Sequence, residues 1–254
     1  MSGPIPLPAL VLILTCLTAV CPAVARGQTG DTHPISLPQP RVDGPMSVEA
    51  ALYQRRSIRR FRDEPVRLAH LGQILWAAQG VTEHIAQPPP GFRHEWRGGL
   101  RTAPSAGALY PLELYALVGD VEGLEPGLYR FQPLEHALAR ITSPDAPPEG
   151  ARVDLREEVS DAALRQLAIR QAPVVLVLAG AVERTTAKYG DRGDRYVHIE
   201  VGAAAQNVYL ECESLELGTV YIGAFDDAAV ETVLGLPDAE QVLGIMPIGH
   251  PAAD

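Results

Sequence analysis

Residues 173–179 read Pro-Val-Val-Leu-Val-Leu-Ala, a nearly continuous apolar run. A short run of this kind predicts a strand that is buried on both faces of a sheet. The longest predicted helix follows it, from about Arg195 to Leu217. Its apolar residues recur every three or four positions, at Val197, Val201, Ala204, Val208, Cys212 and Leu215. Gly218 is expected to end this helix.

Similar patterns on either side of this strand and helix predict the remaining elements. Apolar residues at helical spacing predict helices over residues 48–52, 68–78, 157–170 and 228–234. Short apolar runs predict strands over residues 112–119, 219–222 and 242–248, and a hairpin made by residues 127–131 and 137–141. Helices and strands alternate loosely, which predicts one domain of the α+β (α/β-like) class without an internal repeat.

The composition is that of an ordinary globular protein. The 254 residues include 21 basic and 31 acidic side chains, giving a formal charge of −10 at pH 7, and 46% are hydrophobic. This acidic balance argues against nucleic acid as a partner. Lys188 is the single lysine, and every other basic residue is arginine. A guanidinium stays protonated whereas an amine can lose its proton, so Lys188 is the first cation to consider for proton transfer.

The N-terminal segment predicts export. Residues 1–25 carry no charged side chain, and their apolar run is too short to span a membrane. Ala23-Val24-Ala25 offers a signal-peptidase pattern, so we expect a signal peptide over residues 1–25 and a periplasmic or secreted protein without a stable membrane span. The start lacks a basic residue, which leaves a misplaced start codon or an uncleaved anchor as alternatives. Pro, Gly and polar residues predict an exposed flexible linker over residues 26–45, before a domain over residues 46–251.

Several common site types find no support in the sequence. Only Cys212 lies outside the predicted leader, so no internal disulfide is expected, and its place on an apolar stripe predicts a buried structural thiol. No His-Glu-x-x-His or His-x-x-x-His pair occurs, so no metal site is expected. Neither Gly-x-Ser-x-Gly nor Gly-x-Gly-x-x-Gly is present, which disfavours an α/β-hydrolase and a Rossmann dinucleotide site.

The first candidate motif is Arg55-Arg56-Ser57-Ile58-Arg59-Arg60-Phe61-Arg62, with five arginines and one hydroxyl in eight residues. Guanidinium groups bind phosphate oxygens in pairs, and a serine adds a further donor. On an acidic chain such a cluster favours a small anionic ligand, such as a phosphate monoester, over nucleic acid. A solvated charged turn is an equally good interpretation of this motif alone.

Three further motifs contain residues suited to a ligand or to proton transfer. Residues 104–111, Pro-Ser-Ala-Gly-Ala-Leu-Tyr-Pro, would let the backbone approach a flat ligand, or would simply form a tight turn. Lys188-Tyr189-Gly190 pairs an amine with a phenol; the alternative is an exposed loop lysine beside a packing tyrosine. Residues 218–226 predict a strand whose Gly-Ala end offers exposed backbone amides to a ligand. The alternative is a strand followed by a helix cap at Asp226 or Asp227. On the long helix, Glu200 neighbours Tyr196 and is expected to support the loop before it.

In this order the motifs resemble the FMN-dependent nitroreductase superfamily. The Arg-Arg-Ser-Ile-Arg start at residues 55–59 is shared across that superfamily. Three stretches are more specific to its azoline-oxidising branch, the dehydrogenases of thiazole- and oxazole-peptide biosynthesis: Pro-Ser-Ala-Gly-Ala-Leu-Tyr-Pro-Leu-Glu at 104–113, Lys188-Tyr189-Gly190, and Glu200-x-Gly202-x-x-x-Gln206-Asn207. The resemblance covers about residues 46–251.

This resemblance implies a central mixed β-sheet flanked by helices, and a homodimer whose interface forms the FMN sites. It assigns the FMN phosphate and ribityl chain to Arg55, Ser57 and Arg59, with Arg56 close by. The other cofactor-binding residues it implies are Pro104, Ser105, Ala106 and Gly107 beside the isoalloxazine, Ile222, Gly223 and Ala224 at its other face and N5 edge, and Asn207 on the long helix.

The implied activity is an FMN-dependent oxidoreductase that moves a hydride between a small organic or peptide-derived substrate and flavin N5. Lys188 and Tyr189 would handle the proton that accompanies this transfer. Two alternatives stay open: an NAD(P)H-dependent quinone or nitroaromatic reductase, and a flavin-free secreted binding protein on the same scaffold. Many nitroreductases complete the phosphate site with basic residues after the last strand, where this chain offers His250.

Overall fold

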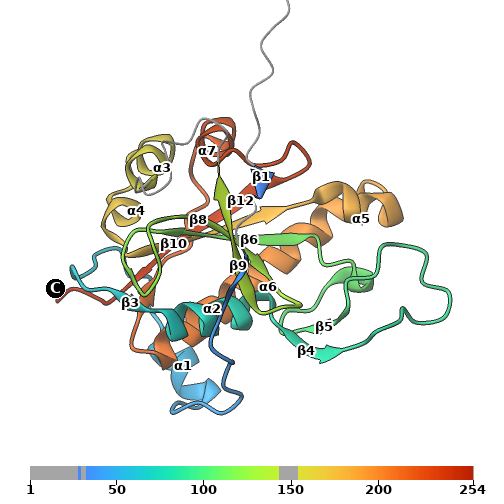
Figure 1. Cartoon of the computed structure of the whole chain (residues 1–254), viewed down its shortest axis with the longest axis horizontal. Helices are drawn as coiled ribbons and strands as arrows, with labels where there is room; N and C mark the ends of the chain where they lie inside the picture. Colours follow the sequence, from blue (N-terminus) through green and yellow to red (C-terminus); the bar gives the residue numbers. More distant parts are fainter. Residues whose placement is uncertain (1–27, 30–32, 143–153, 254) are drawn as a thin grey trace, which may run out of the picture.

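The computed structural model describes residues 28–29, 33–142 and 154–253 (Figure 1). The predicted signal peptide lies outside them. The helices are α1 Val48–Gln54, α2 Leu68–Gln79, α3 Arg156–Ala162, α4 Leu167–Gln171, α5 Val182–Tyr189, α6 Arg192–Ser214, α7 Asp227–Leu234 and the 3-10 turn η1 Ala106–Ala108. The strands are β1 Gln28–Thr29, β2 Ile35–Ser36, β3 Val66–Arg67, β4 Val81–His84, β5 Gly99–Arg101, β6 Leu112–Val118, β7 Val121–Glu122, β8 Gly127–Gln132, β9 Ala137–Thr142, β10 Val174–Gly180, β11 Gly218–Thr219 and β12 Gln241–Gly249.

A sheet of eight strands forms the centre of the molecule. Its order is β1-β9-β8-β6-β10-β12-β11, and β2 also pairs with β9. The pairs between these strands are antiparallel. A parallel bridge between Ser57 and Thr219 extends the sheet at the β11 edge. The sheet is therefore mixed and the fold is a single α+β domain, as predicted.

β10 lies inside this sheet, and all seven of its residues are buried. Val174, Leu176 and Leu178 contact one apolar layer, which α2 and α6 complete. Val175, Val177 and Ala179 join a second layer with α3, α4 and α7. Figure 1 shows these two groups of helices on opposite sides of the sheet. The alternating side chains of one strand thus hold both layers, which confirms the predicted two-sided burial.

The longest helix, α6, packs its predicted apolar stripe into the first layer. Val197, Val201, Ala204 and Val208 are buried. Cys212 is buried as well, and burial raises the pKa of its thiol, which confirms a structural role. No helix within the described residues combines the length and apolar character needed to cross a membrane.

Several elements differ from the predictions. The short strands β3, β4, β5 and β7 were not predicted. α6 ends at Ser214 rather than at Gly218, since Glu216 has a φ of 58° and Gly218 already begins β11. The helix predicted over residues 157–170 is two helices, α3 and α4, because Leu164 and Arg165 between them have φ values of 56° and 61° and break the helical hydrogen-bond ladder. α5 was not predicted, since it is mostly polar and Thr185 is its one buried residue. The strand predicted over residues 219–222 shortens to β11 and a separate bridge between Ile222 and Ile245.

The described part of the predicted flexible linker packs on the domain. β2 pairs with β9, and Leu37 is 4% exposed within the first apolar layer. The side chain of Gln73 in α2 accepts from the Arg41 N–H at 2.8 Å and donates to its carbonyl at 3.1 Å. The Pro and Gly content that suggested a linker concealed two apolar residues, Ile35 and Leu37, which pack against the core.

Candidate active site

Two motifs predicted separately meet at Gly107. This glycine lies within η1 with a φ of 64°. A Cβ at this position would stand 2.6 Å from Lys188 Nζ and 2.7 Å from Tyr189 OH. Such separations are too short for a real Cβ, so a larger residue at this position would displace the tips of Lys188 and Tyr189, and the positive φ favours glycine. The tips of Lys188 and Tyr189 therefore lie directly against the turn formed by residues 104–111.

Lys188 and Tyr189 are the last residues of α5 rather than loop residues. The Tyr189 ring packs edge to face on Tyr196 of α6, with ring centroids 5.1 Å apart. On the other side, Lys188 Nζ lies 5.8 Å from the centroid of Phe92, and the Phe92 ring packs on Trp96. Phe92 and Trp96 belong to the loop between β4 and β5. Aromatic rings thus flank the exposed lysine on two sides.

A buried carboxylate supports the turn from α6. The Ser105 hydroxyl accepts from the Tyr110 N–H at 2.9 Å and also hydrogen-bonds Glu200. Gln79 donates to Glu200 Oε1 at 3.1 Å. Burial raises the pKa of Glu200 to about 7, because desolvation outweighs its hydrogen bonds and nearby positive charges. Glu200 thus supports the Ser105 turn. The sequence had instead predicted that it would support the loop before Tyr196.

The Arg55–Arg62 motif forms a second group. Ser57 Oγ lies 3.2 Å from Tyr209 OH on α6, and the Arg55 guanidinium is 5.4 Å from the centroid of the Tyr209 ring. Tyr209 OH also accepts from the Tyr221 N–H at 2.8 Å. Ser57 and Arg59 are exposed. The group presents guanidinium and hydroxyl donors to solvent, which suits a phosphate.

Two neighbours of this group have other partners. Arg56 Nη1 donates to the carbonyls of Tyr53, Gln54 and Arg55 at 3.0, 3.1 and 2.9 Å, and so caps the end of α1. His250 lies beside the motif, since its carbonyl accepts from the Arg62 N–H at 2.8 Å. Its ring faces the carboxylate of Glu64, with Nε2 and Oε1 3.7 Å apart.

The two groups lie on opposite sides of α6. Glu200 supports the Ser105 turn and Tyr209 contacts Ser57, nine residues further along the same helix. Nine residues make two and a half turns, which displaces the side chains by about 13 Å along the axis and about 180° around it. The Ser57 group and the Ser105 turn therefore contact opposite faces of α6, about 13 Å apart along its axis.

The remaining predicted cofactor residues have clear positions. Ile222 is buried and exchanges two backbone hydrogen bonds with Ile245, while Gly223 and Ala224 are exposed. Asp226 Oδ1 accepts from the Ala229 N–H at 3.0 Å, so the helix-cap interpretation of this motif is confirmed. Across the described ranges, no group of three or more His, Cys, Asp or Glu is arranged to hold a metal ion.

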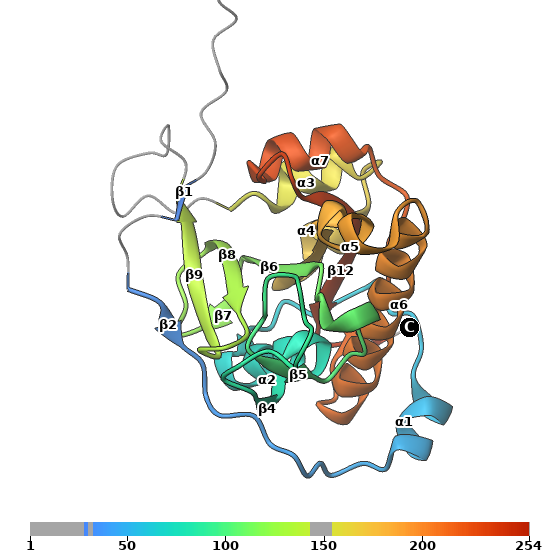
Figure 2. The same ribbon diagram turned by 90° about the vertical axis from the view of Figure 1, so that its right-hand side faces the viewer.

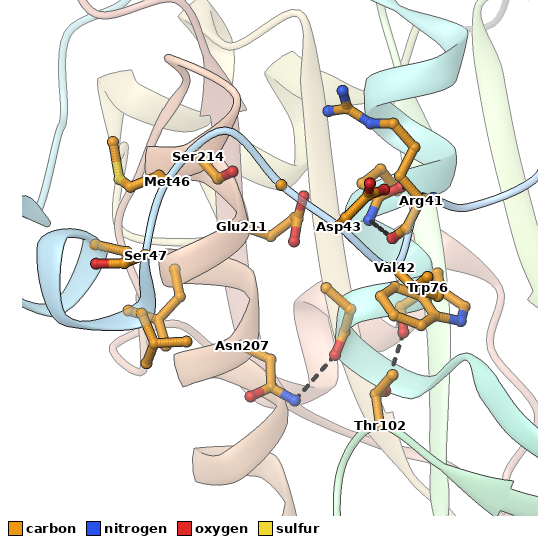
Figure 3. A pocket seen from close by; sticks show the side chains of 16 residues that line it. Arg41, Val42, Asp43, Met46, Ser47, Trp76, Thr102, Asn207, Glu211 and Ser214 are labelled. Carbon is orange, nitrogen blue, oxygen red and sulfur yellow. Dashed lines mark hydrogen bonds between the residues drawn. The ribbon is translucent and has the colours of Figure 1, made fainter.

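Asn207 stands apart from both groups. Its side chain donates to the Ala77 carbonyl of α2 at 2.9 Å. It lines a surface pocket of about 280 Å³ between the segment before α1, α2 and α6 (Figure 3). Arg41, Asp43 and Glu211 also line it. None of the other predicted cofactor-binding residues lines this pocket.

Glu113, the last residue of the 104–113 stretch, was not predicted as a site residue. This carboxylate is buried in β6 and contacts the guanidinium groups of Arg97, Arg130 and Arg184. A signal was present, because Glu113 is the single charged residue in a strand that reads Leu-Glu-Leu-Tyr-Ala-Leu-Val. A buried charge in such a strand requires partners of opposite charge.

Comparison with known proteins shows which family the chain belongs to. The model of the nitroreductase family matches residues 52–250. The chain belongs to the nitroreductase family. A relative from Methanocaldococcus jannaschii is 43% identical over 221 residues, which cover 87% of this chain and 98% of the relative. A solved structure from Ralstonia eutropha JMP134 has a TM-score of 0.69 and 27% identity, with 91% and 95% of the two chains covered. Both proteins carry the name "putative nitroreductase".

A third comparison extends the fold to a multi-protein complex. The Escherichia coli microcin synthetase McbBCD complex contains a chain with a TM-score of 0.59 and 20% identity, covering 88% of this chain and 80% of that one. At this identity the likeness concerns the fold.

Membership of the nitroreductase family makes the protein a flavin-dependent oxidoreductase. Members of the family generally use FMN. The chain offers a donor set that fits this cofactor: Arg55, Ser57 and Arg59 present two guanidinium groups and a hydroxyl at the surface, which match the oxygens of a phosphate monoester.

Proposed function

We propose that the protein is an FMN-dependent dehydrogenase that transfers a hydride from a small organic or peptide-derived substrate to the flavin, while Lys188 and Tyr189 handle the accompanying proton. Bound FMN supplies the acceptor for two electrons. The observation that carries the proposal is the position of Lys188 Nζ and Tyr189 OH, both against Gly107 in the turn implied to border the isoalloxazine.

The two side chains suit a substrate that loses a hydride and a proton together. Oxidation of a C–H bond beside a second ionisable bond, such as the neighbouring ring C–H of a thiazoline, needs a base as well as a hydride acceptor. Lys188 Nζ is the group we assign to this proton, and the adjacent hydroxyl of Tyr189 orients the substrate by hydrogen bonding. Because both tips reach one point of the turn, they act on the same substrate position.

The proposal includes a homodimer in which one protomer supplies Arg55, Ser57 and Arg59 and its partner supplies Lys188. The placement of the two groups on opposite sides of α6 supports this arrangement. Apolar side chains on and before α1 support it too, since Val42, Val48 and Tyr53 are 89%, 63% and 81% exposed. Figure 2 shows α1 at the periphery, beyond α6.

A peptide-derived substrate takes its support from the microcin synthetase complex, which was solved with truncated pro-MccB17 bound. That complex shares the fold with this chain, so we include peptides among the substrates to be tested. The matched probes are a thiazoline-containing dipeptide and a small thiazoline without peptide bonds.

The test measures bound flavin and turnover in three proteins. The purified wild type is expected to take up FMN, seen as a yellow absorption spectrum, and to oxidise at least one thiazoline probe. Lys188→Ala is expected to keep the flavin and lose turnover. Glu183→Gln, an exposed position on the same helix, serves as the control and keeps both. Full turnover in Lys188→Ala would exclude the assigned role, and a colourless wild type would exclude the flavin itself.

A further inference from the structure

Glu113 contacts three arginines, and two of them, Arg97 and Arg184, belong to the segments beside Lys188. Its side chain is 7% exposed, and Oε1 lies 2.8 Å from both Arg97 Nη2 and Arg184 Nη2. Oε2 lies 3.0 Å from Arg130 Nη2. Burial by itself raises the pKa of Glu113, but the charges of these arginines hold it below its ordinary value. Glu113 is therefore an ionised carboxylate shared by three guanidinium groups.

Arg184 links Glu113 to the helix that carries Lys188. It lies on α5, and one arm of its guanidinium contacts Glu113 while Nη1 donates to the Tyr110 carbonyl. Tyr110 belongs to the same turn as Gly107. Arg184 precedes Lys188 by four residues, about one helical turn, so the two side chains lie on the same face of α5. The Arg184 guanidinium thus connects α5 to β6 through Glu113, and to the turn through the Tyr110 carbonyl.

Arg97 links Glu113 to the aromatic loop on the other side of Lys188. It follows Phe92 and Trp96 in the loop between β4 and β5, and Nη1 also contacts Glu95 at 3.1 Å. The Phe92 ring lies 5.8 Å from Lys188 Nζ. A single carboxylate thereby fixes both neighbours of the lysine, the turn and the aromatic loop.

Arg184 can be replaced without leaving the buried Glu113 carboxylate unpaired. Arg130 also contacts Glu240 at 2.9 Å and Arg97 contacts the exposed Glu95 at 3.1 Å, so three carboxylates contact the three guanidinium groups. Removing Arg184 takes away one of the three arginines around Glu113. The buried carboxylate keeps Arg97 and Arg130 as partners, and the variant is therefore expected to fold.

We propose that Glu113 is a positioning residue: through Arg184 it holds Lys188 against Gly107, and through Arg97 it holds the loop that carries Phe92. This inference rests on the proposed function, because it assigns Glu113 a task in placing the residue that handles the proton. Glu113 itself is remote from the reacting atoms and acts through its arginines.

The test combines amide hydrogen exchange with turnover in the FMN-loaded full chain. In Arg184→Met we expect exchange in residues 182–189 to rise about tenfold or more, since the helix loses its side-chain anchor. We expect kcat to fall about tenfold or more with KM and bound flavin unchanged, since Lys188 is then misplaced. In Arg97→Met the exchange should rise in residues 85–98 and KM should increase instead.

Arg130→Met is the matched control. It removes a guanidinium from the same carboxylate but contacts neither α5 nor the loop, so exchange in residues 182–189 should match the wild type. Arg184→Lys keeps the charge but cannot hold Glu113 and the Tyr110 carbonyl together, so its kcat should lie between those of wild type and Arg184→Met.

Wild-type exchange in residues 182–189 of Arg184→Met would overturn the inference, and so would equal exchange in the Arg184 and Arg130 variants. These outcomes are independent of turnover. Full turnover in Lys188→Ala, by contrast, would overturn the proposed function while leaving the exchange result to stand on its own.

Discussion

Gly107 and Lys188 Nζ lie so close together that a Cβ at position 107 would displace the amine. A Cβ on Gly107 would stand 2.6 Å from Lys188 Nζ. The glycine also has a φ of 64°, which disfavours every residue with a Cβ. The end of α5 thus contacts the turn at a residue without a side chain. This contact links the two motifs on which the proposed chemistry depends.

The first prediction concerns this glycine. Gly107→Ala is expected to lose about 1 kcal/mol of stability from its backbone conformation, and to lose turnover about tenfold or more because the new methyl displaces Lys188. Gly123→Ala is the matched control, since its φ is 75° and no heavy atom lies within 4 Å of the point where its new methyl would stand. Thermal unfolding and turnover should show similar destabilisation but a turnover defect in Gly107→Ala alone. Equal turnover in both variants would contradict the contact.

The second prediction concerns the pH dependence of stability. Burial raises the pKa of Glu200 from 4.5 to about 7. Between these values the folded protein keeps a proton that the unfolded chain releases. The stability contributed by this group is therefore fully present below pH 4.5 and is lost as pH rises through 7, by up to about 3 kcal/mol.

Glu200→Gln removes this titration, so its free energy of unfolding should fall less than that of the wild type between about pH 5 and pH 8. Urea denaturation at several pH values measures the difference, with the exposed Glu183→Gln as control. A wild-type slope in Glu200→Gln would show that Glu200 ionises normally in the folded protein.

The third prediction separates the arginines of the first motif. Arg59→Met and Ser57→Ala are expected to weaken FMN binding about tenfold or more, because each removes a donor to a charged phosphate. Arg56→Met should leave FMN affinity nearly unchanged and lower thermal stability instead, since this side chain caps α1. Quenching of FMN fluorescence measures the affinity. A larger loss of affinity in Arg56→Met than in Arg59→Met would reverse the assignment.

Much of the fold follows from local sequence patterns. β10 and α6 are predictable because each carries a long, regular apolar pattern, and Ser47 caps α1 as expected, accepting from the Ala50 N–H at 3.2 Å. α5 is not predictable in this way. It is mostly polar and packs on α6 through the buried Thr185, the close approach of Gly193 and the Tyr189–Tyr196 ring contact, while Arg184 ties it to β6.

The candidate site shows the same division. The residue types at Arg55, Ser57, Lys188 and Tyr189 indicate phosphate binding and proton transfer from sequence alone. Their arrangement does not, because it depends on the long-range pairing of β6 with β10 and on the two sides of α6. The role of Glu113 becomes visible only when three arginines distant in sequence converge on it.

The fourth prediction tests the shared site of the proposed homodimer. At an FMN concentration too low to load Arg59→Met, this variant and Lys188→Ala are each expected to be inactive alone. When the two proteins are unfolded together and refolded as a mixture, about half of the dimers contain one chain of each kind, and each of these holds one intact site. Turnover should then return to about a quarter of the wild-type value. No recovery, with dimers present by sedimentation, would place the whole site within one chain.

The most direct test of proton handling by Lys188 is the rate at which bound FMN is bleached without oxygen by two donors. A thiazoline dipeptide must lose a proton as it gives up its hydride, whereas NADPH gives up a hydride without losing a proton. In Lys188→Ala we expect bleaching by the dipeptide to slow about a hundredfold or more, and bleaching by NADPH, where the wild type supports it, to stay unchanged. Equal rates for the dipeptide in wild type and Lys188→Ala would contradict the proposed role of Lys188.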